Sequence, residues 1–151
     1  PPVVDDDRVY VTGEFEGLTA LSVDSGSREW SRDVPATTVP AVTDDVVAYA
    51  DSDRRDIAAL AVDDGEREWA TTLYAGESVA AGPVADPDTV YVGLDTHDGG
   101  AVRALAADDG SERWTVETEA PVSTPLVVVD GAVLVVSGTG DDTRLRALAE
   151  G

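Results

Sequence analysis

Residues 62–69 read VDDGEREW, and closely similar stretches occupy residues 23–30 (VDSGSREW) and 107–114 (ADDGSERW). Each copy ends in one of the three tryptophans of the chain, four residues after a glycine. A glycine that follows acidic or small polar residues is typical of a tight turn with a left-handed backbone conformation. Because the aromatic side chain recurs at the same place after each turn, the pattern predicts a repeated structural contact.

Other residues recur in the same register, and the tryptophans themselves lie 39 and 45 residues apart. The recurring positions are Ala20, Ala59, Ala104 and Ala147, each followed by a leucine, and Pro2, Pro40, Pro83 and Pro125. These columns divide the chain into four units, at about residues 1–37, 38–80, 81–122 and 123–151. The fourth unit contains no tryptophan.

The third unit predicts four β-strands. Alternating segments rich in β-forming residues occupy residues 82–86, 89–94, 101–107 and 111–118, and turns are expected at 96–100 and 108–110. Four strands joined by short turns form an antiparallel meander, and a repeat of roughly 40–50 residues is typical of a β-propeller blade. The predicted fold class is therefore all-β, a partial β-propeller of three four-stranded blades and most of a fourth, treated as one domain.

Each recurring residue has a predicted structural role. Trp30, Trp69 and Trp114 are expected to anchor neighbouring blades, because an indole buries roughly 200 Å². Gly26, Gly65 and Gly110 are expected to form the turns, and Ala20, Ala59 and Ala104 to offer a small surface to the ring of a neighbouring blade. The turn acids are expected to accept backbone N–H groups, and recurrence argues against the alternative of calcium sites. These acids are Asp24, Asp63, Asp64, Asp108 and Asp109.

The stretches ALSVDSGSREW, ALAVDDGEREW and ALAADDGSERW resemble the tryptophan-docking motif of the PQQ-like (quinoprotein-type) β-propeller repeat family. The resemblance covers nearly the whole chain. It implies a full ring of roughly seven or eight blades, so the chain is either a fragment of a larger propeller or half of a homodimeric ring. Family members usually have an aspartate two residues after the alanine, where this chain has Ser22, Ala61 and Ala106, which predicts weaker contact between blades.

The same resemblance implies two classes of function. The preferred hypothesis is a non-catalytic scaffold or binding module for a protein or ligand, similar to the propellers of outer-membrane assembly lipoproteins and sensor proteins. The alternative is a fragment of a PQQ-dependent dehydrogenase, whose PQQ and calcium would lie outside these residues. Such enzymes hold calcium with Glu, Asn and a catalytic Asp, and this chain has no asparagine. No catalytic or cofactor-binding residue is therefore predicted.

Three further segments contain candidate site residues. Asp95, His97 and Asp98 form a weak metal-ligand set, and the preferred interpretation is an exposed turn in a longer loop. Residues 137–144 (SGTGDDTR) resemble a phosphate-binding loop, but no helix follows them, so a hairpin turn is expected. Residues 51–56 (DSDRRD) are expected to form a solvated turn with local ion pairs.

The net charge of −21 arises from 31 acidic and 10 basic residues, and every basic residue is arginine. Acidic residues spread through a lysine-free chain resemble the proteins of salt-loving archaea, in which molar salt screens their repulsion. Nucleic-acid binding is disfavoured because no basic surface is expected. No apolar run is long enough for a membrane span, and no signal peptide is apparent. The first residue is not Met, which suggests a longer parent protein, and the family resemblance points to an extracellular or cell-surface location.

Overall fold

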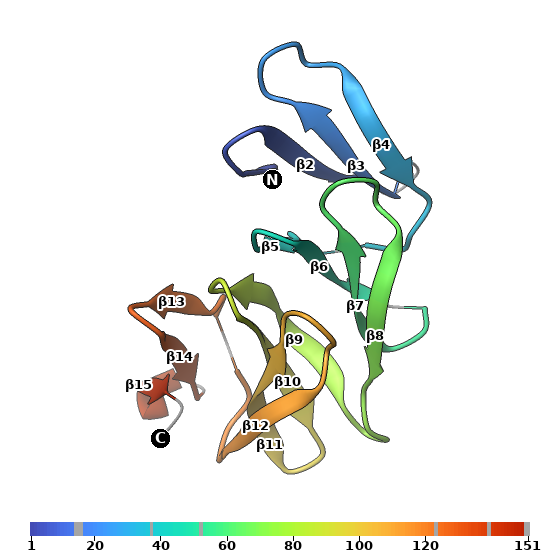
Figure 1. The fold of residues 1–151 in the computed structure, drawn as a ribbon. Helices are drawn as coiled ribbons and strands as arrows, with labels where there is room; N and C mark the ends of the chain where they lie inside the picture. Colours follow the sequence, from blue (N-terminus) through green and yellow to red (C-terminus); the bar gives the residue numbers. More distant parts are fainter. Residues whose placement is uncertain (14–16, 37, 52, 123, 139, 150–151) are drawn as a thin grey trace.

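The computed structural model describes residues 1–13, 17–36, 38–51, 53–122, 124–138 and 140–149. In these residues four antiparallel sheets follow one another along the chain as the blades of a partial β-propeller (Figure 1). Blade 1 consists of β1 (Val3–Val4), β2 (Arg8–Gly13), β3 (Gly17–Ser22) and β4 (Arg28–Arg32). Blade 2 consists of β5 (Ala41–Val42), β6 (Val46–Asp51), β7 (Asp56–Ala61) and β8 (Arg67–Thr72).

Blades 3 and 4 complete the described chain. Blade 3 consists of β9 (Ser78–Ala85), β10 (Thr89–Thr96), β11 (Gly99–Ala106) and β12 (Glu112–Thr118). Blade 4 has three described strands, β13 (Val127–Val129), β14 (Ala132–Ser137) and β15 (Arg144–Ala149), and the one-turn 3₁₀ helix η1 (Gly140–Asp142) lies between β14 and β15. Strands are hydrogen-bonded in sequence order within every blade, so each blade is the predicted meander.

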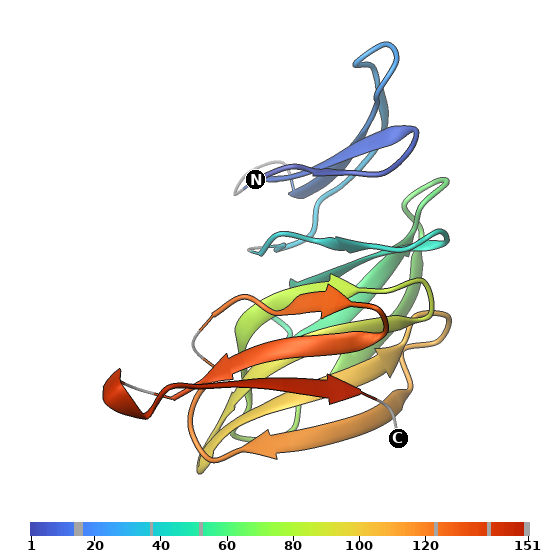
Figure 2. The ribbon, with the colours of Figure 1, turned by 90° about the vertical axis from the view of Figure 1, so that its left-hand side faces the viewer.

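The core lies between the blades. Adjacent sheets stack face to face, as Figure 2 shows from the side, and each of the three boundaries contains one hydrophobic cluster built mainly from Val, Ala and Leu. Strand β6 is buried along its whole length because Val47 and Tyr49 face blade 1 while Val46 and Ala48 face blade 3. The period-two alternation of a strand thus supplies two interfaces at once.

Strand β9 begins at Ser78, four residues before the predicted start. Pro83 lies inside this strand. Ala81 pairs with Gly93 and Val84 pairs with Tyr91, so Gly82 and Pro83 together stand opposite a single residue in a β-bulge. A bulge tolerates proline because the extra residue makes no ladder hydrogen bond.

The predicted long turn at residues 96–100 is wrong. Strand β10 continues to Thr96 and β11 begins at Gly99, so only His97 and Asp98 form the turn. The extra residues of the third unit lengthen the paired strands to eight residues, against six in β6 and β7.

The turn at residues 51–56 is also less solvated than expected. Asp51 is only 3% exposed, and its Oδ1 accepts the N–H groups of Asp53 (3.1 Å) and Arg54 (2.9 Å). The aspartate therefore closes the turn from inside the sheet. Residues 137–144 connect β14 to β15 as predicted, through η1, where Thr143 Oγ1 donates to Gly140 O (2.9 Å).

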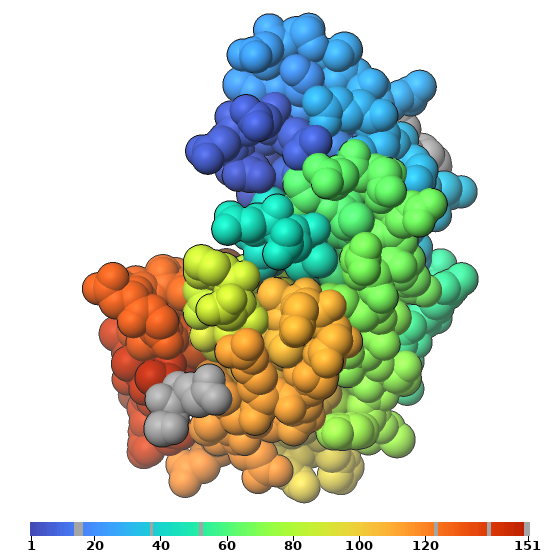
Figure 3. Space-filling view, viewed as in Figure 1, coloured from blue at the N-terminus to red at the C-terminus, as the bar shows by residue number. Residues whose placement is uncertain are grey.

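The two end blades leave apolar faces uncovered. Blades 1 and 4 lie at opposite ends of the arc in Figure 3. Val11 and Val23 are exposed on blade 1, and Val127, Val129 and Leu145 are exposed on blade 4. Among the described residues, no helix is long and apolar enough to cross a membrane.

Candidate functional site

Two tryptophans cross from the outer strand of one blade to the next blade. Trp30 Nε1 donates a hydrogen bond to Val62 O (2.8 Å), and Trp69 Nε1 donates to Ala107 O (2.8 Å). The carbonyl acceptors occupy equivalent positions, three residues before Gly65 and Gly110. Each buried indole therefore contributes both apolar area and a satisfied polar atom to its boundary.

The ring of Trp30 lies against Gly65, where a Cβ atom would stand 2.6 Å from Trp30 Cε3. The same arrangement holds for Trp69 and Gly110, and both glycines have a φ of +71°. The glycine therefore serves the turn and also receives the ring. Sequence reasoning assigned the second role to the alanine; Ala20 instead pairs with Trp30 across β3 and β4 of a single blade, as Ala59 pairs with Trp69.

A second hydrogen bond crosses each of these boundaries, two residues after the tryptophan. Arg32 Nε donates to Gly65 O (2.9 Å), and Thr71 Oγ1 donates to Gly110 O (2.5 Å). Sequence reasoning missed these contacts, although a polar side chain at this position in both copies was a usable signal. The corresponding residue after Trp114 is Val116.

Blade 3 presents Trp114 toward blade 4. Its ring lies 5.8 Å from that of Tyr91, as the ring of Trp30 lies 6.0 Å from Tyr10. The position equivalent to Val62 and Ala107 is residue 150, which lies outside the described residues. Ala104 pairs with Trp114 as in the other blades.

The turn acids bind the backbone of their own turns. Asp64 Oδ1 accepts the N–H of Glu66 (2.8 Å), and Asp109 Oδ1 accepts the N–H of Ser111 (2.8 Å). The hydrogen bonds from the Ser111 side chain and backbone lower the pKa of Asp109. In blade 1 the Ser25 hydroxyl occupies the equivalent place.

The predicted metal-ligand set is not gathered into one site. His97 and Asp98 are exposed at the tip of the hairpin and line a pocket with Glu117 and Glu119. Asp95 does not line this pocket. In the part of the chain that the structure describes, no three metal-ligating side chains come together.

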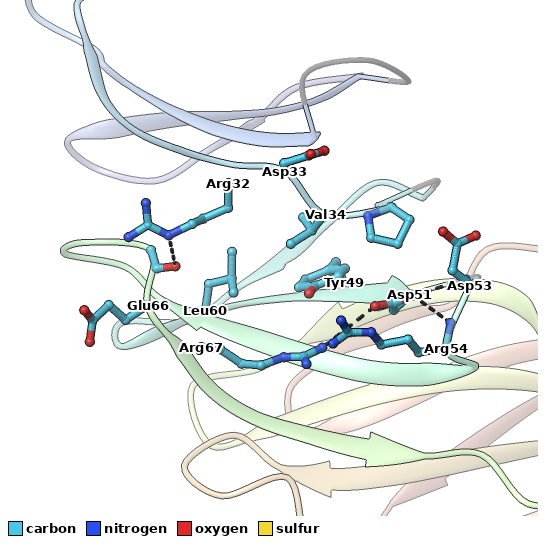
Figure 4. A pocket seen from close by; sticks show the side chains of 12 residues that line it. Arg32, Asp33, Val34, Tyr49, Asp51, Asp53, Arg54, Leu60, Glu66 and Arg67 are labelled. Atoms are coloured by element: carbon cyan, nitrogen blue, oxygen red, sulfur yellow. Dashed lines mark hydrogen bonds and ion pairs between the residues drawn. The ribbon is translucent and has the colours of Figure 1, made fainter.

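A cleft of about 520 Å³ opens between blades 1 and 2 (Figure 4). We call it the 1–2 cleft; its walls are Arg32 to Pro35, Tyr49, Asp51, Asp53, Arg54, Leu60 and Gly65 to Arg67. Arg54 and Arg67 extend toward Asp51 from opposite ends, and Arg67 Nη2 lies 3.8 Å from Asp51 Oδ2. Burial raises the pKa of Tyr49, an effect that the Arg67 charge partly offsets. Sequence reasoning did not find this cleft.

The corresponding place between blades 2 and 3 is filled by Arg103. Its side chain is 2% exposed, and Nη1 and Nη2 donate to the two carboxylate oxygens of Glu77 (2.9 and 2.6 Å). Glu112 lies 3.1 Å from Nε, and the guanidinium stands over the Tyr74 ring at 4.5 Å. We call these four residues the Arg103 cluster.

Comparisons with known proteins agree with this architecture. The family model described as outer membrane protein assembly factor BamB matches residues 1–94 and again residues 56–151. No curated protein matches the sequence. Many solved structures match, but those reported below are all under 25% identical to this chain and therefore show the fold alone.

Three solved structures illustrate the likeness. BamB from Moraxella catarrhalis has a TM-score of 0.70 at 20% identity, over 89% of this chain and 45% of that one. The quinohemoprotein alcohol dehydrogenase ADHIIG from Pseudomonas putida HK5 has a TM-score of 0.73 at 19% identity, over 92% of this chain and 28% of that one. The computationally designed Ika4 protein has a TM-score of 0.77 at 13% identity, over 99% of this chain and 89% of that one.

This chain thus spans less than half the length of the BamB structure that it matches. The two family matches overlap at residues 56–94, so repeat units in the middle of the chain take part in both. Because they cover the sequence from residue 1 to residue 151, the chain belongs to the BamB-type family of PQQ-like β-propeller repeats.

Proposed function

We propose that this chain is a non-catalytic β-propeller module that acts by binding other protein surfaces. The observation that carries the proposal is the difference between three equivalent glycines. Gly65 and Gly110 each receive a tryptophan ring from the preceding blade. Gly26 has the same left-handed backbone (φ +67°), but among the described residues no atom lies within 4 Å of its Cβ position.

The face of blade 1 around Gly26 repeats the chemistry of the buried interfaces. Val23 corresponds to Val62, whose carbonyl accepts the Trp30 hydrogen bond, and Val23 is 47% exposed. Val11 and Leu21 line the same open face with Arg28. An apolar face of this kind favours a protein partner, because its burial is the main source of association energy.

We propose that the open face of blade 1 packs against further blades of the same type, and not against a second copy of this chain. A second copy would offer the free face of its blade 4, and the unit at residues 123–151 contains no tryptophan to fill the place above Gly26. The greater length of the matched BamB structure supports the same choice. A homodimeric ring remains the competing proposal.

The alternative function is that of a fragment of a PQQ-dependent alcohol dehydrogenase. The likeness to quinohemoprotein alcohol dehydrogenases supports it at the level of fold. We prefer the binding module because Trp30, Arg32 and Arg103, which lie between blades, already bond to protein atoms and not to a cofactor. We propose no cofactor or metal for this chain, and we propose a salt-rich working environment from its net charge of −21.

Two measurements test this proposal. Titration of the parent protein with PQQ and Ca²⁺, followed by a dye-linked alcohol oxidation assay, should give neither tight binding nor turnover. Turnover would overturn the non-catalytic assignment. Light scattering on this chain in molar KCl should give the mass of one copy, 15.7 kDa. A concentration-dependent doubling that Gly26→Val abolishes would favour the homodimer instead.

A further inference from the structure

The 1–2 cleft is the open counterpart of the Arg103 cluster. Ala59 pairs with Trp69 as Ala104 pairs with Trp114, so Ala58 and Arg103 occupy the same place in their blades. Both side chains face the preceding blade. Alanine lacks the long side chain of Arg103. The Tyr49 ring, which stands in the place of Val92, takes part of the freed space, and the rest is open as the 1–2 cleft.

The side chains that surround this space also differ between the two boundaries. Glu112 of the Arg103 cluster corresponds to Arg67, since these residues pair with Leu105 and Leu60. Val79 pairs with Leu94, and Ala36 pairs with Asp51, which is the counterpart of Leu94 in blade 2. Val79 and Ala36 are therefore equivalent, and so are the residues two positions before them, Glu77 and Val34. Both carboxylates that hold a guanidinium between blades 2 and 3 are thus absent from the 1–2 cleft, and a cation stands in place of one of them.

The cleft has one apolar wall, and two arginines face it. Val34, Pro35, Leu60 and the Tyr49 ring form the apolar wall. Arg54 and Arg67 reach toward the buried Asp51 carboxylate from opposite ends, and among the described residues no hydrogen bond or ion pair holds the Arg54 guanidinium. Among the described residues, Arg67 makes one long ion pair, to Asp51, and a side-chain hydrogen bond with Tyr49. Donors therefore remain on both guanidiniums for a ligand.

We propose that the 1–2 cleft binds a single carboxylate attached to an apolar group, with the carboxylate on the remaining guanidinium donors of Arg54 and Arg67 and the apolar group against Val34 and Leu60. Arginine binds carboxylates through paired N–H donors. The cleft volume of about 520 Å³ is in the usual range for ligand sites.

The rim sets the selectivity. Asp33, Asp53 and Glu66 surround the opening and repel polyanions, so inorganic phosphate should bind poorly. A cationic ligand is disfavoured, because it would lie beside the positive charge of Arg67, and the cleft lacks counterparts of Glu77 and Glu112, the two glutamates that hold Arg103. The ligand chemistry is available from two sources, a free carboxylic acid or the C-terminal carboxylate of a peptide. The inference needs only one copy of the chain and is independent of what covers blade 1.

The test is an NMR titration of this chain in molar KCl. The probes are 3-phenylpropionate, its neutral amide, and the peptide acetyl-Ala-Ala-Phe with a free or an amidated C-terminus. We expect backbone amide shifts at residues 33–34, 49–51 and 65–67 with at least one of the two carboxylate probes and with neither amide. Shifts with 3-phenylpropionate indicate a free acid as the source, and shifts with the peptide alone indicate a C-terminus.

Matched variants make the test specific. Arg54→Gln should weaken binding about tenfold or more, because Arg54 is exposed and its side chain makes no contact that folding needs. Arg28→Gln removes the same charge at the position of blade 1 that corresponds to Arg67 and should leave binding unchanged. Equal binding of acid and amide, equal effects of the two variants, or no shifts at millimolar probe would each overturn the proposal.

Discussion

Trp30 and Gly65 lie against each other across the boundary between blades 1 and 2, and Trp69 and Gly110 repeat the contact at the next boundary. The glycine is the point where two requirements meet. Its φ of +71° closes the turn, and its missing side chain leaves room for the indole. The stretch VDDGEREW therefore makes contacts on both sides of blade 2: its glycine packs against the tryptophan of the preceding blade, and its own tryptophan packs on the following blade.

The first prediction concerns Gly65→Ala. The new methyl group would meet Trp30 Cε3 at 2.6 Å and would occupy a left-handed backbone position. We expect the free energy of unfolding to fall by about 2–4 kcal/mol, from overpacking and backbone strain together. Chemical denaturation in molar KCl measures this loss.

The control for this prediction is Gly76→Ala. Gly76 also has a positive φ (+89°), but among the described residues its Cβ position meets no atom within 4 Å. This variant should lose only the strain component, about 1 kcal/mol. If both variants lose the same free energy, the ring contact at Gly65 contributes nothing.

The second prediction concerns the anchor itself. Trp69→Ala removes a buried indole and its hydrogen bond to Ala107 O, so unfolding should become easier by about 3–5 kcal/mol. Trp69→Phe retains most of the apolar area and should lose about 1–2 kcal/mol, since the Ala107 carbonyl then lacks its donor. Thermal and denaturant unfolding of the two variants check this order. A loss below about 1 kcal/mol for alanine would show that Trp69 does not hold the blades together.

The sequence predicts the blades but not the contacts between them. Strand alternation, as around Tyr91, and the recurring turn glycine, as at Gly65, are local patterns. The meander and its turns could therefore be predicted without knowing which blade lies beside which. The burial of Arg103 depends on Glu77 and Tyr74, which lie in the connection between β8 and β9, and strand periodicity does not specify these contacts. The 1–2 cleft is a difference between equivalent boundaries, so it becomes visible only when the boundaries are superimposed.

The third prediction concerns Arg103. Glu77→Gln leaves the buried guanidinium with a neutral partner on one side, and unfolding should become easier by about 3 kcal/mol or more. Arg103→Met replaces the cation by an apolar side chain but leaves Glu77 without its partner, so it should also destabilise. The double variant should lose less free energy than the sum of the two single variants.

The reference pair for this cycle is Arg144 and Glu119, which are both exposed and 3.7 Å apart. Their neutralisation should change stability by less than about 1 kcal/mol. Additive losses at Arg103 and Glu77 would contradict their assignment as a coupled pair.

The last prediction concerns salt. Acidic side chains gather in turns at one end of blades 1, 2 and 3, at residues 5–7, 44–45, 63–66 and 108–109, and no arginine lies in these turns. Their mutual repulsion opposes the close approach of neighbouring blades. At about 1 M salt the screening length falls to about 3 Å, so the repulsion between adjacent turns should largely vanish. The melting temperature should therefore rise steeply with KCl up to molar concentrations. Sucrose at the same osmolality stabilises proteins without screening charge and should give a smaller rise. A melting temperature that responds equally to KCl and sucrose would show that charge repulsion between the blades does not limit stability.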